Sequence, residues 1–372
     1  MTNLEVRRRL LIVIPVYGSY RAFLKGLASW LSERGWEVHI ATNLKASVAE
    51  PDVVALHQVD MPRGANPLQL LKASRQLQAL IYEIQPSVVH AHFSVGMLVL
   101  ALVSRVKNAR RLGTFQGMRF PLDSGFSRWV FKLVECFSIL RLDQSWVLTA
   151  DDYEAVPWFV HCKLAIQDGY GFGCDIEHFD SARFSDADKA KLRSKLEIPD
   201  EDYVFIFVGR LTAFKGFPLA LEAFQQLRKE RSDVHFLIVG EADPQHPLDL
   251  PELNSLEAVH HVGWQDDPAP YLSISNTMVF PSEREGVPVC VMEALAMGLF
   301  VVGNDVRGVN KLLEDFGSRR LPVSSRGEGS TCTLKSAMGD ALACKQSESA
   351  FSPVRQKLSR RLFYETVLRD YA

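Results

Sequence analysis

The stretch TMVFPSEREGVPVCVMEALAMGLFVVGN, residues 277–304, holds the pattern that decides the fold. An apolar run at 277–282 leads into a polar loop, in which Gly286 permits close approach of the backbone. Helix formers follow over 288–297, with Pro288 suited to the first helical turn, and a second apolar run occupies 300–304. A strand, a helix and a strand joined by short loops are typical of a β-α-β unit, whose two strands lie parallel in one sheet.

The same alternation is present along most of the chain. Further strand-like runs lie at 9–16, 36–43, 87–93, 109–117, 203–209, 234–240 and 258–264. Helical patterns lie at 21–35, 68–86, 96–108, 217–230, 267–275 and 354–370, and 323–333 has the composition of a mobile loop. The alternation weakens over the glycine-rich residues 168–180. We therefore expect two α/β units, each built on a parallel sheet, that meet near residues 165–175.

Composition excludes several classes of protein. The 372 residues are 47% hydrophobic and carry a net charge of −2, so the chain as a whole has no bias toward nucleic acid. Six scattered Cys without a CxxC pair favour a reducing, cytoplasmic setting. The short apolar run after the N-terminal arginines is interpreted as a strand, and no stretch reaches the roughly 18 apolar residues of a membrane span.

Ligands of open parallel sheets bind beyond the carboxyl ends of the strands, where two loops of this chain carry charges. In VGRLTAFKG, residues 208–216, Arg210 and Lys215 flank a short loop before a helix begins at Gly216. Two cations beside a helix N-terminus form an anion site, because free N–H groups and the helix dipole add to the attraction. The alternative is a pair of solvated loop cations.

The second loop and the helix after it carry two carboxylates whose presence in an apolar segment needs an explanation. Glu285 lies in the loop and Glu293 lies in the apolar helix that follows it. A buried carboxylate is costly unless it is hydrogen-bonded or paired, so Glu293 needs a partner. That partner is either a pair of ligand hydroxyls, such as those of a ribose, or a neighbouring Arg or Lys. Glu285 precedes the helix and is free to point at the same ligand.

Weaker signals lie in the first half. Gly18 in VYGSYR turns the first strand into a helix, but the loop is not GxGxxG and does not predict a nicotinamide site. His90 and His92 alternate on a strand without acidic companions, so they are either partly buried strand histidines or functional groups. Basic and aromatic side chains gather in 20–34 and 105–132, which suits an anionic membrane surface or an ordinary solvated face.

Several motifs in this order make the chain recognisable. VGRLTAFKG, VGWQDD, FPSEREGVPVCVMEALAMGLFVVGNDVRG, GFGCDIEHFD, VVHAHF and RGWEVHIATN resemble segments of glycosyltransferase family 4, retaining enzymes of the GT-B fold. The most specific element is the E-x7-E pair of Glu285 and Glu293. The resemblance is strongest to bacterial enzymes that extend lipid-linked sugars for capsule, exopolysaccharide or O-antigen.

The resemblance implies two Rossmann-like domains with parallel sheets facing a central cleft. The N-terminal domain, 1–168, would bind the acceptor, and the C-terminal domain, 169–353, would bind a nucleotide-sugar. The C-terminal helix, 354–372, would pack back on the first domain.

Site roles carry over from the family's motifs as implications of the resemblance. Arg210 and Lys215 would bind the donor diphosphate, Glu293 the ribose hydroxyls, and Glu285 the transferred sugar. Catalysis would rest on Glu285, Arg210 and Lys215. The remaining donor-side positions are Gly18 beneath the diphosphate, Gly263 and Trp264 near the base, and Gly209, Gly286, Val287 and Pro288 along the two loops.

One departure concerns the acceptor side, for which His92, Gln116 and Arg119 are the candidates. The family often has His where this sequence has Gln116, and Gln carries no proton at neutral pH. Either that His is not essential in this chain or the activity is reduced. In the front-face mechanism the leaving phosphate takes the acceptor proton, so cations at that phosphate would supply the main catalytic stabilisation.

The expected activity is retaining transfer of a hexosyl or N-acetylhexosaminyl group from a UDP-sugar to a lipid-linked or glycan acceptor. No metal or other cofactor is expected, because the nucleotide-sugar is a substrate. The expected location is cytoplasmic, with peripheral contact to anionic lipid on the inner face of the membrane and no nucleic-acid partner. The alternatives are a nucleotide-sugar-binding partner of low activity in an assembly complex and a nucleotide-sugar epimerase of GT-B fold.

Overall fold

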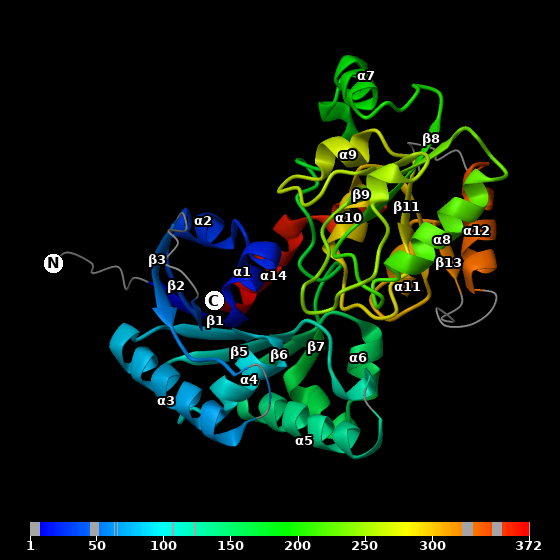
Figure 1. Cartoon of the computed structure of the whole chain (residues 1–372). Coiled ribbons are helices and arrows are strands. Elements are labelled where there is room, and N and C mark those ends of the chain that lie inside the picture. The colour runs from blue at the N-terminus through cyan, green and yellow to red at the C-terminus, as the bar shows by residue number, and fades with distance from the viewer. Residues whose placement is uncertain are drawn as a thin grey trace. The chain divides into compact units, whose positions relative to one another are not determined.

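Two parallel sheets organise the chain (Figure 1). The structure is a computed structural model that describes residues 8–44, 52–62, 64, 66–105, 108–122, 124–321, 330–343 and 352–371. The chain divides into two compact units, one of Met1–Phe172 with Phe363–Ala372 and the other of Gly173–Leu362. It therefore leaves the first unit once and returns to it at its end. The expected α/β architecture with two parallel sheets is confirmed.

The first sheet has seven strands in the order β3-β2-β1-β4-β5-β6-β7. Its strands are β1 (Arg8–Val16), β2 (Trp36–Asn43), β3 (Val53–Gln58), β4 (Val88–His92), β5 (Arg110–Phe115), β6 (Gln144–Val147) and β7 (Leu164–Ile166). Every pairing among them is parallel. Residues Leu10 to Ile14 of β1 are wholly buried, because helices cover both faces of the sheet.

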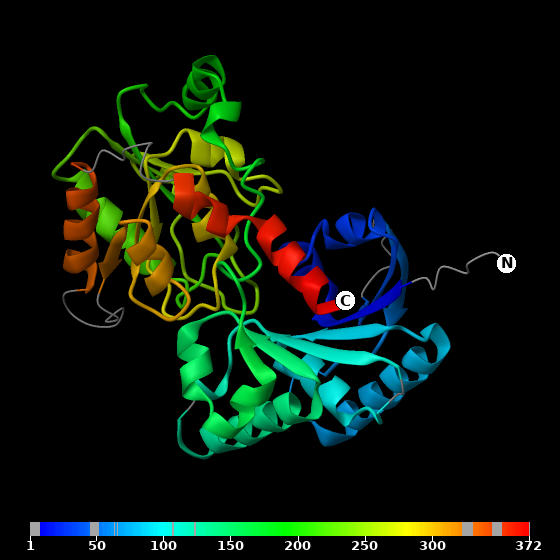
Figure 2. The same ribbon diagram turned by 180° about the vertical axis from the view of Figure 1, so that it is seen from behind.

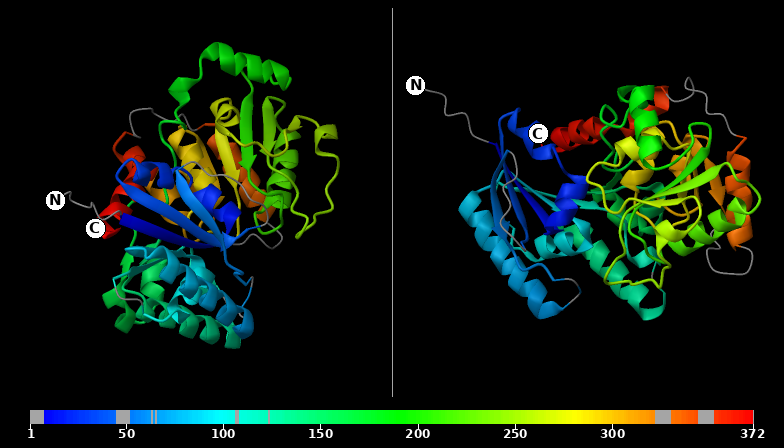
Figure 3. Two further views of the ribbon diagram at one scale, coloured as in Figure 1. Left: turned by 90° about the vertical axis from the view of Figure 1, so that its left-hand side faces the viewer. Right: turned by 45° about the horizontal axis from the view of Figure 1, so that its top comes forward.

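The helices of this unit lie in two layers. Helices α3 (Pro67–Ile84), α4 (Phe93–Leu102) and α5 (Gly125–Arg141) lie together on one face (Figures 1 and 3). The other face has α1 (Tyr17–Phe23), α2 (Leu27–Ser32) and the end of α14 (Arg360–Tyr371), whose ribbon lies beside the N-terminal elements in Figure 2. The short elements α6 (Ala150–Ala155), η1 (Phe120–Leu122) and η2 (Trp158–Lys163) complete the unit.

The second sheet has six parallel strands in the order β10-β9-β8-β11-β12-β13. They are β8 (Tyr203–Val208), β9 (Val234–Val239), β10 (Val259–His261), β11 (Thr277–Phe280), β12 (Phe300–Asn304) and β13 (Arg319–Leu321). Its helices are α7 (Asp186–Lys195), α8 (Phe217–Arg228), α9 (Ala269–Ser273), α10 (Val289–Ala296), α11 (Asn310–Asp315), α12 (Ser330–Ala341) and α13 (Ser352–Arg355). The 3-10 turns are η3 (Ser181–Arg183), η4 (Leu253–Ser255) and η6 (Gln356–Leu358). Helices α8 and α12 pack on the same apolar core, which includes Phe224, Phe236 and Met338.

The helix predicted over 21–35 is wrong as a single element. It is divided into α1 and α2 at Gly26, which has a left-handed backbone with φ of 87°. The hydroxyl of Tyr364 in α14 donates to the carbonyl of Lys25 at 2.7 Å, and a Cβ on Gly26 would lie 3.1 Å from that hydroxyl oxygen. A contact made by the far end of the chain therefore fixes the break.

The helix predicted over 354–370 is also divided, because another segment takes its backbone groups. Cys174 N donates to the carbonyl of Leu358 at 2.7 Å, and Arg360 N donates to the carbonyl of Cys174 at 2.8 Å. These bonds replace helical ones between η6 and α14. Of the predicted loop 323–333, residues 330–333 belong to α12 and the rest lie outside the described residues.

Candidate functional site

In the second sheet, the strand order changes direction between β8 and β11. From β8 the chain moves through β9 and β10 toward one edge, and β11, β12 and β13 then follow toward the other. The loops after β8 and β11 therefore leave neighbouring strands at the same edge. Crevices at such switch points are the usual ligand sites of open α/β sheets. These are the two loops whose charges the sequence pointed to.

Backbone contacts hold these two loops together. Glu283 N donates to the carbonyl of Phe214 at 2.9 Å, which joins the loops directly. The side-chain amide of Asn304 donates to the carbonyls of Pro281 and Ser282 at 3.0 and 3.1 Å. Gly216 has φ of 73°, and a Cβ there would overlap the carbonyl of Pro281. These hydrogen bonds fix the two loops against each other, and the loops can approach this closely because Gly216 has no Cβ.

This junction brings Lys215 and Glu285 into contact. Lys215 Nζ lies 2.6 Å from Glu285 Oε1, and both side chains are mostly buried. Little water screens a charge-assisted hydrogen bond in such surroundings. The two groups were expected to face a ligand, and here each is the other's partner.

Arg210 also has a carboxylate partner, one that the sequence analysis missed. Arg210 Nη1 lies 2.6 Å from Oδ2 of Asp243, which is largely buried in the loop after β9, whereas the arginine is exposed. The N–H of Gln245, donating to Oδ1 at 2.9 Å, is the main cause that lowers the pKa of Asp243, with His246 and Arg210 adding to it. Only the position of Asp243 just beyond a strand end could have suggested this role.

Glu293 is the unpaired carboxylate of the site. It lies in α10, which begins after Pro288 rather than at it, and is buried on most sides. Within the described part of the chain its side chain makes no hydrogen bond or ion pair. Burial raises the pKa of Glu293 to about 7, although the charge of Arg360 lowers it in part. The ion-pair alternative is therefore not realised among these residues.

Both glutamates act on one neighbouring thiol. Burial raises the pKa of Cys290 to about 12; Lys215 opposes this shift, whereas the charges of Glu285 and Glu293 add to it. The E-x7-E pair is thus brought to one locality, around Cys290, at the start of α10. Gly286 and Val287 lie in the same turn, against which Gly308 packs so closely that a Cβ would overlap the carbonyl of Gly286.

The other donor-side positions lie along the same sheet edge. Gly209 N donates to the carbonyl of Val239 at 3.0 Å, and the carbonyl of Gly263 accepts from Gly240 N at 2.8 Å. These bonds extend the ladder just past β8, β9 and β10. Trp264 follows with its indole ring exposed.

In the first unit, the strand order changes direction between β1 and β4, and Gly18 and His92 lie just there. Gly18 is exposed in the first turn of α1, and a Cβ on it would meet no atom within 4 Å. No steric need for glycine exists at this position, contrary to the close turn expected from the sequence.

The buried His92 and the partly buried Gln116 form a neutral pair. Gln116 Oε1 accepts from Phe93 N at 2.6 Å, which turns the Gln116 amide nitrogen toward His92 Nδ1 at 3.0 Å. His92 then carries its proton on Nε2, which is buried and has no hydrogen-bond partner within the described residues. Burial and the neighbouring His90 hold the pKa of His92 well below its usual value. Gln116 therefore fixes a histidine tautomer.

His90 is structural. Its Nδ1 lies 2.8 Å from the hydroxyl of Tyr371 and its Nε2 lies 2.8 Å from Thr114 Oγ1. It is wholly buried rather than partly so, and burial lowers its pKa to about 3.

The loop that carries Arg119 is held by a buried carboxylate that the sequence analysis missed. Glu135 Oε1 accepts from Arg119 N at 3.0 Å and from Ser94 Oγ at 2.6 Å, and Oε2 accepts from Phe120 N at 3.3 Å. Burial raises the pKa of Glu135 despite these bonds. The Arg119 guanidinium itself lies 4.1 Å from the centre of the Phe131 ring.

Comparison with known families identifies the chain. Residues 188–327 match the family described as "Glycosyl transferases group 1", and residues 17–137 match "Glycosyl transferase 4-like". The chain therefore carries a glycosyltransferase 4-like domain and a group 1 glycosyltransferase domain, and it has the GT-B fold.

Relatives and solved structures agree with this family. The glycosyltransferase is 22% identical over 305 residues to the capsular polysaccharide biosynthesis glycosyltransferase CapM of Staphylococcus aureus, covering 77% of this chain and 76% of CapM. It is 24% identical over 261 residues to the UDP-Gal:alpha-D-GlcNAc-diphosphoundecaprenol alpha-1,3-galactosyltransferase of Escherichia coli, covering 68% and 66%. Its fold matches a glycosyltransferase from Rickettsia africae with a TM-score of 0.73, at 17% identity over 98% of each chain.

Two features are absent from the described residues. No three His, Cys, Asp or Glu side chains of the glycosyltransferase come together there as a possible metal site. In the same part of the chain, no helix has both the length and the apolar character needed to cross a bilayer.

The buried state of Glu293 predicts a pH-dependent stability. Its pKa is about 7 in the fold and 4.5 in the unfolded reference, so the folded state binds more protons between these values. Stability is therefore lost as pH rises from about 4.5 to 7. We expect Glu293→Gln to gain about 1–3 kcal/mol over wild type between pH 5 and pH 7.5, measured by urea unfolding. Glu283→Gln is the control, and an equal gain at both pH values would contradict the assignment.

Proposed function

We propose that this glycosyltransferase moves a sugar, with retention, from a UDP-sugar to a lipid-linked or glycan acceptor in bacterial surface polysaccharide synthesis. The observation that carries the proposal is the gathering of Lys215, Glu285 and Glu293 at the switch point of the second sheet. A cation with two carboxylates offers separate partners for a diphosphate and for sugar hydroxyls.

The donor would occupy this edge of the sheet. Lys215 and Arg210 meet its diphosphate beside the N-terminus of α8, where the helix dipole favours an anion. Glu293 accepts hydrogen bonds from the ribose hydroxyls, which gives its unpaired carboxylate a partner. The base lies toward Gly263 and Trp264, while Gly209, Gly286, Val287 and Pro288 shape the loops around the diphosphate.

Donor binding would rearrange the Lys215–Glu285 pair. A diphosphate carries more charge than Glu285, so it draws the ammonium group of Lys215 away. Glu285 is then left to accept hydrogen bonds from hydroxyls of the transferred sugar. Before the donor binds, Lys215 and Glu285 therefore neutralise each other. After it binds, Lys215 contacts the diphosphate and Glu285 contacts the sugar.

The proposed transfer step needs no side chain of the protein as a base. The bond between the anomeric carbon and the diphosphate oxygen breaks as the acceptor hydroxyl oxygen forms a new bond on the same face. The acceptor proton passes to the departing diphosphate oxygen, and Arg210 and Lys215 stabilise the developing negative charge. His92 and Gln116 stay neutral and, with Arg119, border the acceptor. No metal or cofactor takes part in this scheme.

The acceptor and the base are proposed from the relatives. The Escherichia coli relative is named for a UDP-sugar donor and a diphosphoundecaprenol acceptor, and the Staphylococcus aureus relative for capsule synthesis. We therefore propose a hexosyl or N-acetylhexosaminyl donor and an acceptor carrying a lipid diphosphate, met in the cytoplasm at the inner face of the membrane.

Glu285→Ala tests the proposed site. We expect transfer to fall at least about 100-fold, since Glu285 contacts the sugar that moves, while UDP affinity by calorimetry changes less than about threefold. Glu283→Ala, in the same loop, is the matched control and should retain transfer. Full transfer by Glu285→Ala would contradict the proposal.

The alternatives give different results in the same assays. UDP binding without turnover over a panel of donors and acceptors would indicate a non-catalytic binding partner. Release of free sugar and UDP without an acceptor would indicate an epimerase.

Membrane contact is proposed through one face of α5. Five large apolar side chains on this helix are exposed, at helical spacing: Phe126, Trp129, Leu133, Phe137 and Leu140. Phe126 is 84% and Leu133 is 70% exposed, and a continuous apolar stripe of this kind marks an interaction surface. Trp158 and Phe159 of the adjacent η2 are exposed as well.

Charge favours an anionic bilayer as the partner of this stripe. Arg128, Lys132 and Arg141 flank it on α5, and the helix's single acid, Glu135, is buried on the core side. Basic residues beside exposed aromatic and leucine side chains are typical of helices that lie in a membrane interface. In the face predicted over 20–34, Phe23 and Trp30 pack against the rings of Phe172 and Tyr364, so we propose α5 as the membrane surface.

Sedimentation with vesicles tests the α5 surface. We expect binding to vesicles rich in phosphatidylglycerol, and at least about tenfold weaker binding for Phe126→Ser combined with Leu133→Ser, because two inserted side chains are lost. Leu68→Ser, an equally exposed apolar position on α3, is the control. Equal binding by the double variant and wild type would contradict the assignment.

A further inference from the structure

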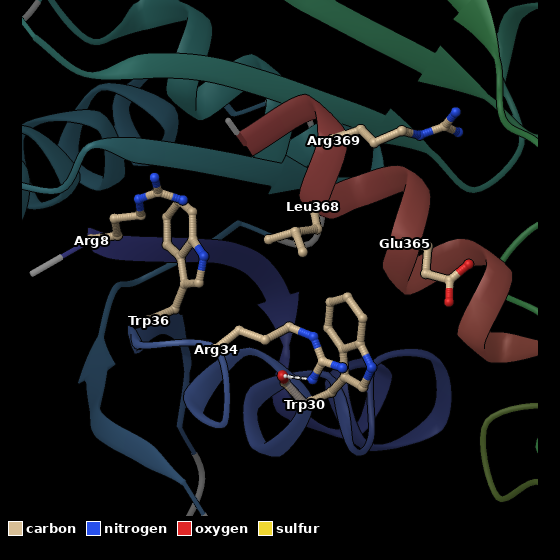
Figure 4. Close-up of a pocket in the computed structure, with 7 residues that line it drawn as sticks. All are labelled: Arg8, Trp30, Arg34, Trp36, Glu365, Leu368 and Arg369. Atoms are coloured by element: carbon tan, nitrogen blue, oxygen red, sulfur yellow. Dashed lines mark hydrogen bonds between the residues drawn. The ribbon is translucent and has the colours of Figure 1, made fainter.

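A pocket of about 470 Å³ lies in the first unit, apart from the candidate acceptor positions His92, Gln116 and Arg119. Its walls come from α2, the amino ends of β1 and β2, and α14, as Figure 4 shows, with Arg8, Trp30, Arg34, Trp36, Leu368 and Arg369 as the main lining residues. Gly18, which follows β1, and His92, the last residue of β4, lie at the carboxyl ends of these strands instead. The pocket is therefore at the opposite edge of the sheet from the candidate acceptor site.

The lining is cationic. Three arginines, Arg8, Arg34 and Arg369, line it with one acid, Glu365, and Arg34 Nη1 also lies 3.4 Å from Glu33 Oε2. Arg34 is fixed, because its Nη1 donates to the carbonyl of Trp30 at 2.8 Å and its guanidinium lies 3.9 Å from the Trp30 ring centre. Arg369 shares its charge with Asp168 at 2.7 Å outside the wall. Arginine forks in such an arrangement favour carboxylate or phosphate groups.

Trp36 supplies an unused donor to the same pocket. Its side chain is only 4% exposed, and its indole N–H has no acceptor within the described residues. In Figure 4 the indole nitrogen lies on the side of the ring that faces Leu368. A buried donor left without an acceptor costs free energy, so a ligand oxygen that accepts a hydrogen bond from the indole N–H of Trp36 would remove this cost.

We propose that this pocket binds an anionic saccharide. Its carboxylate or phosphate is held by Arg34 with Arg8 and Arg369, and a hydroxyl or carboxylate oxygen accepts from Trp36 Nε1. Leu368 and the indole edges cover the apolar C–H surface of the sugar ring. The volume is in the range of pockets that hold a small molecule. The site goes beyond the proposed transfer and does not depend on it.

Calorimetric titration of the full-length chain without donor tests the site. The probes are a glucuronic-acid disaccharide for the carboxylate form, glucose 1-phosphate for the phosphate form, a neutral glucose disaccharide, and inorganic phosphate. We expect one charged saccharide to bind at least about tenfold more tightly than the last two, since charge and sugar contacts are both needed. Saturating UDP should not displace it, because the donor site lies in the other unit.

Two variants assign the binding to this pocket. Arg34→Gln should weaken binding about tenfold, and Trp36→Phe, which keeps the ring and removes the N–H, about threefold. Arg75→Gln on the exposed face of α3 is the matched control, and thermal unfolding verifies that each variant folds. Unchanged affinity in Arg34→Gln, displacement by UDP, equal affinity for inorganic phosphate, or no binding of either charged saccharide would each overturn the proposal.

Discussion

The backbone hydrogen bond from Glu283 N to the carbonyl of Phe214 is the constraint on which the candidate site depends. It joins the loops after β8 and β11, and Asn304 and Gly216 close the same junction from β12 and from the start of α8. The loops contribute backbone groups to these contacts, but the junction also needs the side chain of Asn304 and the absence of a Cβ at Gly216. Lys215 and Glu285 meet as a consequence, although 70 positions separate them in sequence. The fold therefore holds these charges in contact before any ligand is present.

Sequence patterns were sufficient for the parts of the fold that rest on local order. The buried strands and the helices between them follow from apolar periodicity, and the parallel sheets follow from their alternation. Gly26 and Ser359 lie where this reasoning failed. In both places a distant segment, Tyr364 in one case and Cys174 in the other, takes the hydrogen-bonding groups of a helix that is locally favourable. Periodicity contains no information about such partners, so each predicted helix was too long.

The candidate site, too, could be predicted from the sequence only in part. Arg210, Lys215, Glu285 and Glu293 could be found from sequence because each is a charge in or next to a strand-to-helix loop. Their pairing could not, since it depends on which loops the sheet order makes neighbours. Asp243 and Glu135 were missed for another reason: nothing nearby in the sequence marks them as buried. Both serve loops from a distance, Asp243 through Arg210 and Glu135 through the backbone of Arg119 and Phe120.

The candidate positions in the two units differ in whether a side chain can take up a proton near neutral pH. In the first, His92 is neutral, Gln116 fixes its tautomer, and burial keeps the imidazole from taking a proton at physiological pH. In the second, Glu293 has a pKa of about 7 and no partner among the described residues. A histidine in place of Gln116 would need another arrangement to hold Phe93 N and His92 Nδ1 together. Gln suits this position because its amide both accepts and donates, and the proposed front-face scheme, in which the departing phosphate takes the proton, requires no proton transfer from it.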